Sequence, residues 1–127
     1  MTSRPYHLGI KGEQAAAEYL KKKGYKIIAQ NYKSRWGEID VIAHDGAALC
    51  FIEVRTRLTD SQGHPFETVT NYKKRRIIRT ALYYLQEKGL SDDEVRFDVV
   101  AVIPSEDDAD TDFTIEIIQN AFDADMG

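Results

Sequence analysis

Two strand-like segments joined by a tight turn constrain the fold of this chain more than any other feature. Residues 38–44 and 48–57 are rich in β-branched and aromatic side chains, and the dipeptide Asp45-Gly46 lies between them. This dipeptide is a strong short-range hairpin signal, because both residues tolerate the positive φ angles of a type I′ turn. The two segments therefore predict an antiparallel β-hairpin.

The register of this hairpin decides which side chains share a face. With that dipeptide as the loop, Asp40 pairs with Phe51 and Glu38 pairs with Glu53. Because side chains alternate along a strand, one face carries Glu38, Asp40, Ile42, Leu49, Phe51, Glu53 and Arg55. The opposite face is apolar and typical of a core, and it carries Ile39, Val41, Cys50, Ile52 and Val54. A shift of one residue in the pairing would exchange the two faces.

Asp40 and Glu53 become diagonal neighbours in this register, with Cβ atoms roughly 7–8 Å apart at most. Two carboxylates about 4 Å apart repel by roughly 4 kcal/mol at an effective dielectric of 20, so the pair needs a cation or a proton. Oxygen ligands with open positions suit Mg²⁺ or Mn²⁺, which bind phosphates directly. The residues alone also allow an exposed face with cross-strand ion pairs, although the neighbouring Ile42 and Phe51 indicate burial.

Two helices are predicted on either side of these strands. The first covers residues 9–23 and ends at Gly24, and the second covers residues 70–88 and ends at Gly89, since glycine is typical of a helix C-terminus. The apolar stripe of the first helix consists of Ile10, Ala17 and Leu20. That of the second consists of Ile77, Ile78, Ala81, Leu82 and Leu85.

Three further strands complete the pattern, at residues 25–30, 96–103 and 113–118. The resulting order α-β-β-β-α-β-β predicts an α/β fold, with a central mixed five-stranded sheet flanked by helices. No repeat or long linker divides the chain. Residues 1–122 are therefore expected to form a single domain, and residues 123–127 a short acidic tail.

Charge and cysteine content bear on partners and compartment. Eight of the 21 acids lie in residues 105–127, which leaves 13 acids against 17 bases in residues 1–104. A mildly basic body is compatible with a polyanionic partner. The single cysteine, Cys50, cannot form an internal disulfide, which fits a reducing cytoplasm. No apolar run is long enough to cross a bilayer, so no membrane association is expected.

Several polar residues have two readings from the residues alone. A basic cluster at the start of the second helix consists of Lys73, Lys74, Arg75, Arg76 and Arg79. Two interpretations are open: contact with a phosphate backbone, or a solvated helix face. Trp36 and Tyr32 stack on splayed bases or pack at the rim of the core, and packing is favoured. Glu13 lies early in the first helix, where a carboxylate interacts well with the helix dipole. Arg96 and Asp98 share a strand face, which predicts a structural ion pair.

A family resemblance covers the chain from Gly9 to about Phe122. It rests on Gly12-Glu13, Gly24-Tyr25, Asn31-Tyr32, Gly37-Glu38-Ile39-Asp40, Phe51-Ile52-Glu53-Val54-Arg55-Thr56-Arg57 and Arg96-Phe97-Asp98-Val99-Val100. These segments resemble the YraN-type family of uncharacterised bacterial proteins. That family is similar to archaeal Holliday-junction resolvases and to the PD-(D/E)xK superfamily, so the resemblance implies a restriction-endonuclease-like fold.

The resemblance also implies roles for individual residues. Asp40 corresponds to the metal-binding aspartate of the superfamily, Glu53 to its (D/E), and Glu13 to a helix acid that completes the metal site, with Glu38 a further candidate. Arg55 stands where the superfamily usually has lysine. It can supply positive charge to a phosphate, but it stays protonated and cannot act as a general base.

The expected function is that of an endonuclease-like protein that uses Mg²⁺ or Mn²⁺ and hydrolyses DNA phosphodiesters, including those of branched DNA. The expected catalytic residues are Asp40, Glu53 and Arg55. The residues expected to bind nucleic acid are Arg57, Lys73, Lys74 and Arg76. Resolution of a junction needs two active sites, so a homodimer fits by analogy. Two alternatives stay open: a non-catalytic nucleic-acid-binding module, favoured by the arginine in the lysine position, and an interaction protein that uses its acidic tail.

Overall fold

A computed structural model describes residues 4–56, 69–90, 92–105 and 112–123, with residues 4–8 as backbone only. Along the chain the elements are α1 (Arg4–Lys22), β1 (Lys26–Ser34), β2 (Gly37–Asp45), β3 (Ala48–Thr56), α2 (Asn71–Lys88), β4 (Val95–Pro104) and β5 (Phe113–Phe122). The predicted order α-β-β-β-α-β-β is confirmed. The first and last strands extend four residues further toward the C-terminus than predicted. Of the predicted tail 123–127, the stretch 124–127 lies outside the described residues.

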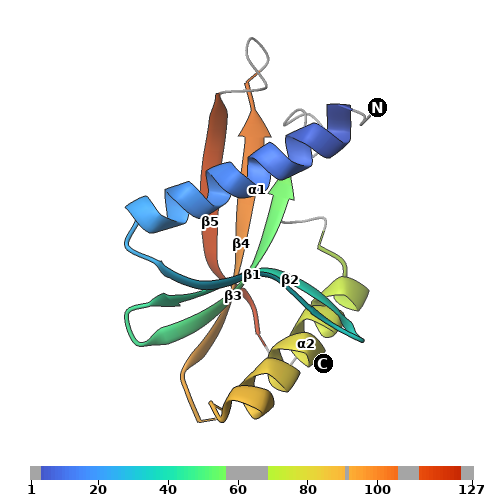
Figure 1. The fold of residues 1–127 in the computed structure, drawn as a ribbon, viewed down its shortest axis with the longest axis vertical. Helices are drawn as coiled ribbons and strands as arrows, with labels where there is room; N and C mark the ends of the chain where they lie inside the picture. The colour runs from blue at the N-terminus through green and yellow to red at the C-terminus, as the bar shows by residue number, and fades with distance from the viewer. Residues whose placement is uncertain (1–3, 57–68, 91, 106–111, 124–127) are drawn as a thin grey trace.

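The five strands form one mixed sheet in the order β1-β2-β3-β4-β5. Strands β3 and β4 are parallel, and the other neighbouring pairs are antiparallel. Because two neighbouring parallel strands need a crossover, α2 connects β3 to β4. In Figure 1, α1 crosses β4 and β5, whereas α2 lies near the β1–β2 hairpin. This α/β architecture is consistent with the predicted restriction-endonuclease-like fold.

Both helices end near the predicted glycines, but α1 begins at Arg4, five residues earlier than predicted. The side chain of Thr70 accepts a hydrogen bond from the Lys73 N–H and caps α2 at its N-terminus, and Gly89 ends α2 with a left-handed φ of 69°. The apolar stripes were partly wrong, because Ile10 is 42% exposed and Leu82 is 55% exposed. Both lie at the edge of a stripe, where the helix surface faces solvent. Neither described helix is long and apolar enough to cross a membrane.

The predicted hairpin is present, but its register was wrong by two residues. Asp45 pairs with Ala48, and Ile42 rather than Asp40 pairs with Phe51. The loop therefore begins at Gly46, whose φ of 60° is typical of the first central residue of a type II′ turn. A shift of two residues preserves the alternation of side chains, so the predicted grouping of Asp40 with Glu53 survives.

Two buried clusters cover the two faces of the sheet. Ile42, Phe51 and Phe97 pack under α2, whereas Cys50 and Ile52 pack under α1. One predicted position was wrong: Ile39 packs with Ile42 in the α2 cluster and not with the opposite face. The reason is local. The β2–β3 pairing runs only as far as Val41–Ile52, and strict alternation breaks down beyond it, at Asp40.

The predicted ion pair of Arg96 and Asp98 is confirmed. The Arg96 Nε donates to Asp98 Oδ1 at 2.9 Å, and its Nη2 donates to Asp45 Oδ2 at 2.8 Å. Asp98 is fully buried and also accepts hydrogen bonds from the Tyr25 hydroxyl and from the Asn120 N–H, at 3.2 Å and 2.9 Å. A buried carboxylate with this many donors is electrostatically satisfied.

Close packing of α1 on β3 makes Gly12 sensitive to substitution. A Cβ atom at Gly12 would lie 3.3 Å from the Cβ of Thr56 and would overlap its hydroxyl group, whereas a Cβ at Gly9 would meet nothing. We expect Gly12→Ala to lower the free energy of unfolding by about 1–2 kcal/mol despite its better helix propensity. The matched variant Gly9→Ala should raise it by up to about 1 kcal/mol. Urea denaturation measures both, and equal stabilisation would contradict the tight helix–strand contact.

Candidate active site

The hairpin brings the two predicted acids together, at the point where β2 leaves β3. Asp40 Oδ2 accepts a hydrogen bond from the Val54 N–H at 2.7 Å, so a carboxylate replaces the backbone partner that a regular ladder would supply. Glu53 is 5% exposed, and its carboxyl group lies close enough to that of Asp40 to raise the pKa of Asp40. Both acids therefore point to one place, as predicted, although strict alternation is lost at Asp40.

This arrangement is electrostatically unfavourable for two ionised carboxylates. Burial raises the pKa of Asp40 well above its usual value, and the hydrogen bond and charge of Glu53 raise it further. The Val54 N–H opposes this shift in part, because it favours the ionised form. Burial also raises the pKa of Glu13, with smaller contributions from Glu38 and Glu53. Four acids from α1, β2 and β3 thus influence one another.

A lysine of α2 faces the acid pair. Lys73 Nζ lies 2.9 Å from Glu53 Oε2, and this oxygen is buried without a hydrogen-bond partner among the described residues. The contact is therefore an ion pair without hydrogen-bond geometry. Lys73 reaches the acid because Thr70 caps α2 and orients its first turn, where the Lys73 N–H donates to Thr70 Oγ1 at 3.1 Å.

The acids line a cavity of about 400 Å³ that opens to solvent. Its walls carry three acids, Glu38, Asp40 and Glu53, and three bases, Lys33, Lys73 and Arg76. Lys33, which comes from the end of β1, was not predicted from the sequence. Acids that can hold a cation stand beside bases that can hold phosphate oxygens, so the cavity is suited to a phosphodiester.

Three other predicted site residues, Arg55, Lys74 and Glu13, are not among the residues that line this cavity. Arg55 is half-buried on β3, two residues after Glu53, and Lys74 places its ammonium group over the ring of Phe122. Arg57 lies outside the described residues. Glu13 is half-buried on α1 and interacts electrostatically with Glu38 and Glu53.

The residues present fit a hard divalent cation. No group of three His, Cys, Asp or Glu side chains within the described ranges is arranged to hold a metal ion. Mg²⁺ usually takes one or two carboxylates and completes its shell with water and substrate phosphates. The Asp40–Glu53 pair supplies that number, and the buried Oε2 of Glu53 lacks a hydrogen-bond donor within the described part of the chain.

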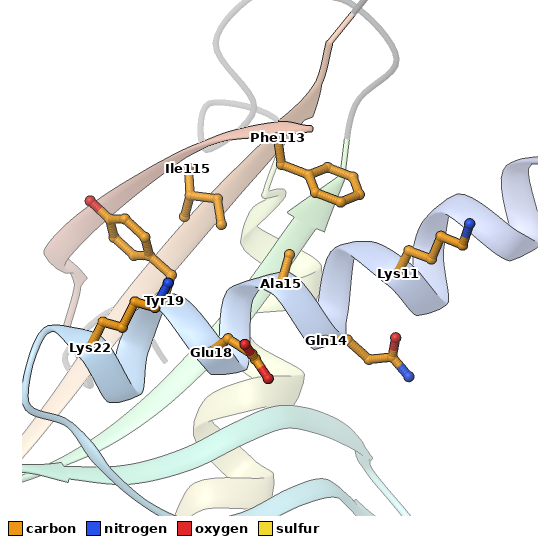
Figure 2. A pocket seen from close by; sticks show the side chains of 8 residues that line it. All are labelled: Lys11, Gln14, Ala15, Glu18, Tyr19, Lys22, Phe113 and Ile115. Carbon is orange, nitrogen blue, oxygen red and sulfur yellow. The ribbon is translucent and has the colours of Figure 1, made fainter. Parts of the chain in front are cut away.

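A second hollow, of about 670 Å³, lies between α1 and β5. Figure 2 shows Phe113 and Ile115 of β5 facing the part of α1 that carries Ala15 and Tyr19. Glu18 is the one acid among the described residues that line it. This hollow has no carboxylate pair and shares no lining residue with the acid cavity.

The fold and the cavity define an α/β protein with a mixed five-stranded sheet, consistent with the restriction-endonuclease-like class, and with a pair of neighbouring acids at the end of a hairpin. Comparison with known proteins then places it in a family. The model of the uncharacterised protein family UPF0102 matches residues 12–102, and this chain belongs to that family. The predicted YraN-type membership is thereby confirmed.

Relatives cover nearly the whole chain. A UPF0102 protein of Chlorobium limicola is 48% identical over 124 residues, which is 96% of each chain. One of Desulfosudis oleivorans is 44% identical over 126 residues, or 99% of this chain and 98% of its own. One of Symbiobacterium thermophilum is 49% identical over 117 residues, or 92% of this chain and 97% of its own.

Proposed function

We propose that this protein is a divalent-metal-dependent nuclease that hydrolyses DNA phosphodiester bonds in the cavity of Asp40 and Glu53. The observation that supports this most is the close pair of carboxyl groups of half-buried Asp40 and buried Glu53, which line a cavity together with three bases. A fold gains nothing in stability from such a pair unless a cation or proton neutralises it. Perturbed carboxyl groups in a cleft are typical of catalytic sites.

Four residues that line the cavity have a role in this reaction. Asp40 and Glu53 would hold Mg²⁺ or Mn²⁺, and the Val54 N–H fixes the orientation of Asp40. The bound metal would polarise the phosphodiester and lower the pKa of an attacking water. Lys73 and Arg76 face the same space. They would bind the non-bridging oxygens of the phosphate and stabilise the charge that develops on them.

The proposed substrate is DNA, and the resemblance to Holliday-junction resolvases extends the proposal to branched DNA. Cleavage of a junction on two strands would require two copies of the site, and hence a homodimer. Such a protein would act in the cytoplasm, and the free, buried Cys50 fits this compartment.

Arg55 favours a second candidate, a nucleic-acid-binding module that keeps the nuclease fold without catalysis. An arginine stays protonated and cannot accept a proton from water. The two candidates differ in one result. Metal-dependent cleavage of a four-way junction or of another DNA form supports the nuclease, whereas metal binding without cleavage of any DNA form leaves the module.

Metal binding and pH test the acid pair directly. Because the folded state raises the pKa of Asp40, it keeps a proton that the unfolded chain loses above about pH 4. The free energy of unfolding of the metal-free protein should therefore fall as the pH rises from about 4 toward the raised pKa of Asp40. Mn²⁺ should restore it at pH 8 and raise the melting temperature by several degrees.

The variant Asp40→Asn provides the contrast, because its amide is neutral and can still accept from the Val54 N–H. Without metal at pH 8 it should exceed the wild type in unfolding free energy by roughly 1–3 kcal/mol, since each unit of pKa shift corresponds to about 1.4 kcal/mol. It should bind no Mn²⁺ in calorimetric titration. Equal Mn²⁺ affinity in the variant and the wild type would exclude Asp40 as a ligand.

A further inference from the structure

A groove beside the acid cavity combines partly exposed aromatic rings with arginines. We call it the aromatic–arginine groove and define it by Arg35, Trp36, Tyr72, Arg75, Arg76, Arg79 and Tyr83. It consists of two adjoining hollows of about 680 and 400 Å³, which share Trp36, Arg79 and Leu82. The groove runs along the outer side of α2 and meets the turn between β1 and β2.

The aromatic rings of this groove are arranged as a surface for flat ligands. Tyr72 is 64% exposed, which is unusual for so large a ring. The rings of Trp36 and Tyr83 have their centroids 5.5 Å apart. Guanidinium groups already lie over two of the rings, Arg35 over Trp36 at 4.8 Å and Arg76 over Tyr72 at 5.5 Å. Nucleic-acid bases can stack on such rings, because every base has a flat π face.

The charge of the groove selects an anionic partner. Arg35, Arg75, Arg76 and Arg79 line it, and no Asp or Glu is among its described lining residues. A second copy of this chain would bring the same positive charges into apposition, which disfavours self-association here. A polyanion whose bases are free to stack matches both the charge and the rings.

The groove is continuous with the acid cavity. Arg76 lines both, and Trp36 directly precedes Gly37, which lines the acid cavity. A nucleic-acid strand whose phosphate lies between Asp40 and Lys73 can therefore continue into the groove without leaving the surface. Double-stranded DNA would present paired bases that cannot reach the rings.

We propose that the aromatic–arginine groove binds a single-stranded segment of nucleic acid, with bases stacked on Trp36, Tyr72 and Tyr83 and with arginines on the backbone. This inference deepens the proposed function. It makes the substrate a DNA with an unpaired arm next to the scissile phosphate, such as a flap or a splayed branch. Binding in the groove needs neither metal nor hydrolysis.

Trp36 allows a direct test, because it is the only tryptophan of the chain. Oligo-dT and a blunt duplex of equal length are titrated in EDTA, and tryptophan fluorescence is recorded. We expect quenching by oligo-dT, with an affinity at least about 10-fold higher than for the duplex. Unchanged fluorescence, or equal affinity for both DNAs, would overturn the stacking surface.

Variants separate the rings from general electrostatics. Tyr72→Leu and Tyr83→Leu alter partly exposed rings, and each should weaken oligo-dT binding by about 5-fold or more. The control Tyr19→Leu alters a ring on α1, over the opposite face of the sheet, and should bind like the wild type. Groove variants with wild-type affinity would overturn the inference.

The same measurements distinguish this inference from the proposed function. A wild type that binds oligo-dT with quenching but cleaves no DNA supports the groove and contradicts the nuclease. A wild type that cleaves duplexes, and whose groove variants bind oligo-dT normally, overturns the groove and supports the nuclease.

Discussion

The Lys73→Met variant is expected to cleave DNA roughly 10²–10³-fold more slowly than the wild type in Mg²⁺ or Mn²⁺, which is the usual loss when one preorganised donor is removed. Its Mn²⁺ affinity should not fall. The ammonium of Lys73 lies 2.9 Å from Glu53 Oε2, so lysine and metal compete for the same carboxylate. Single-turnover cleavage and calorimetric Mn²⁺ titration measure the two effects separately. A merely structural lysine would not produce this split.

Two further variants identify which positively charged side chain is needed for cleavage. Lys74→Met removes the next lysine along α2, whose ammonium lies over Phe122, and it should cleave within a few fold of the wild-type rate. Arg55→Met tests the residue that the superfamily pattern places in the lysine position. Full loss of cleavage in Arg55→Met together with normal cleavage in Lys73→Met would assign the role to Arg55 and contradict the role of Lys73.

Asp98→Ala is expected to lower the free energy of unfolding by roughly 3–5 kcal/mol, because it leaves the partly buried charge of Arg96 short of a partner. The Tyr25 hydroxyl and the Asn120 N–H lose an acceptor in the same step. Domains of this size have a total stability of about 5–15 kcal/mol, so the variant would be close to unfolding. Urea denaturation monitored by circular dichroism measures the loss.

Asp92→Ala is the matched control, since Asp92 is an exposed aspartate before β4. Its unfolding free energy should stay within about 0.5 kcal/mol of the wild type. The double variant Arg96→Met/Asp98→Leu should lose less than Asp98→Ala, because no buried charge is left behind. A loss in Asp98→Ala as small as that in Asp92→Ala would mean that the network contributes little to stability.

Much of the fold was readable from local patterns. Alternating strand residues predicted the hairpin and the shared face of Asp40 and Glu53, and glycines predicted the ends of both helices. The ion pair of Arg96 and Asp98 was also readable, because residues two apart on a strand point the same way. These features depend on neighbours in the chain, so the sequence carries them.

The departures from strict strand alternation arise where an aspartate side chain accepts a hydrogen bond from a main-chain N–H of another strand. Asp40 accepts the N–H of Val54, and Asp98 accepts that of Asn120 beside a shift in the β4–β5 register. Each contact lies where the regular pairing of neighbouring strands is interrupted. Periodicity cannot reveal such a contact, because the two partners are far apart in sequence.

The sequence by itself determined the order of the elements, the face on which the two acids lie and the family of the protein. The tertiary structure alone decided the two-residue shift in the hairpin register, the ion pair of Lys73 with Glu53 and the position of Arg76 between the acid cavity and the aromatic–arginine groove. The physical reason is the range of the forces involved. Periodicity and capping act over a few residues, whereas the position of α2 against β3 follows from packing across the sheet.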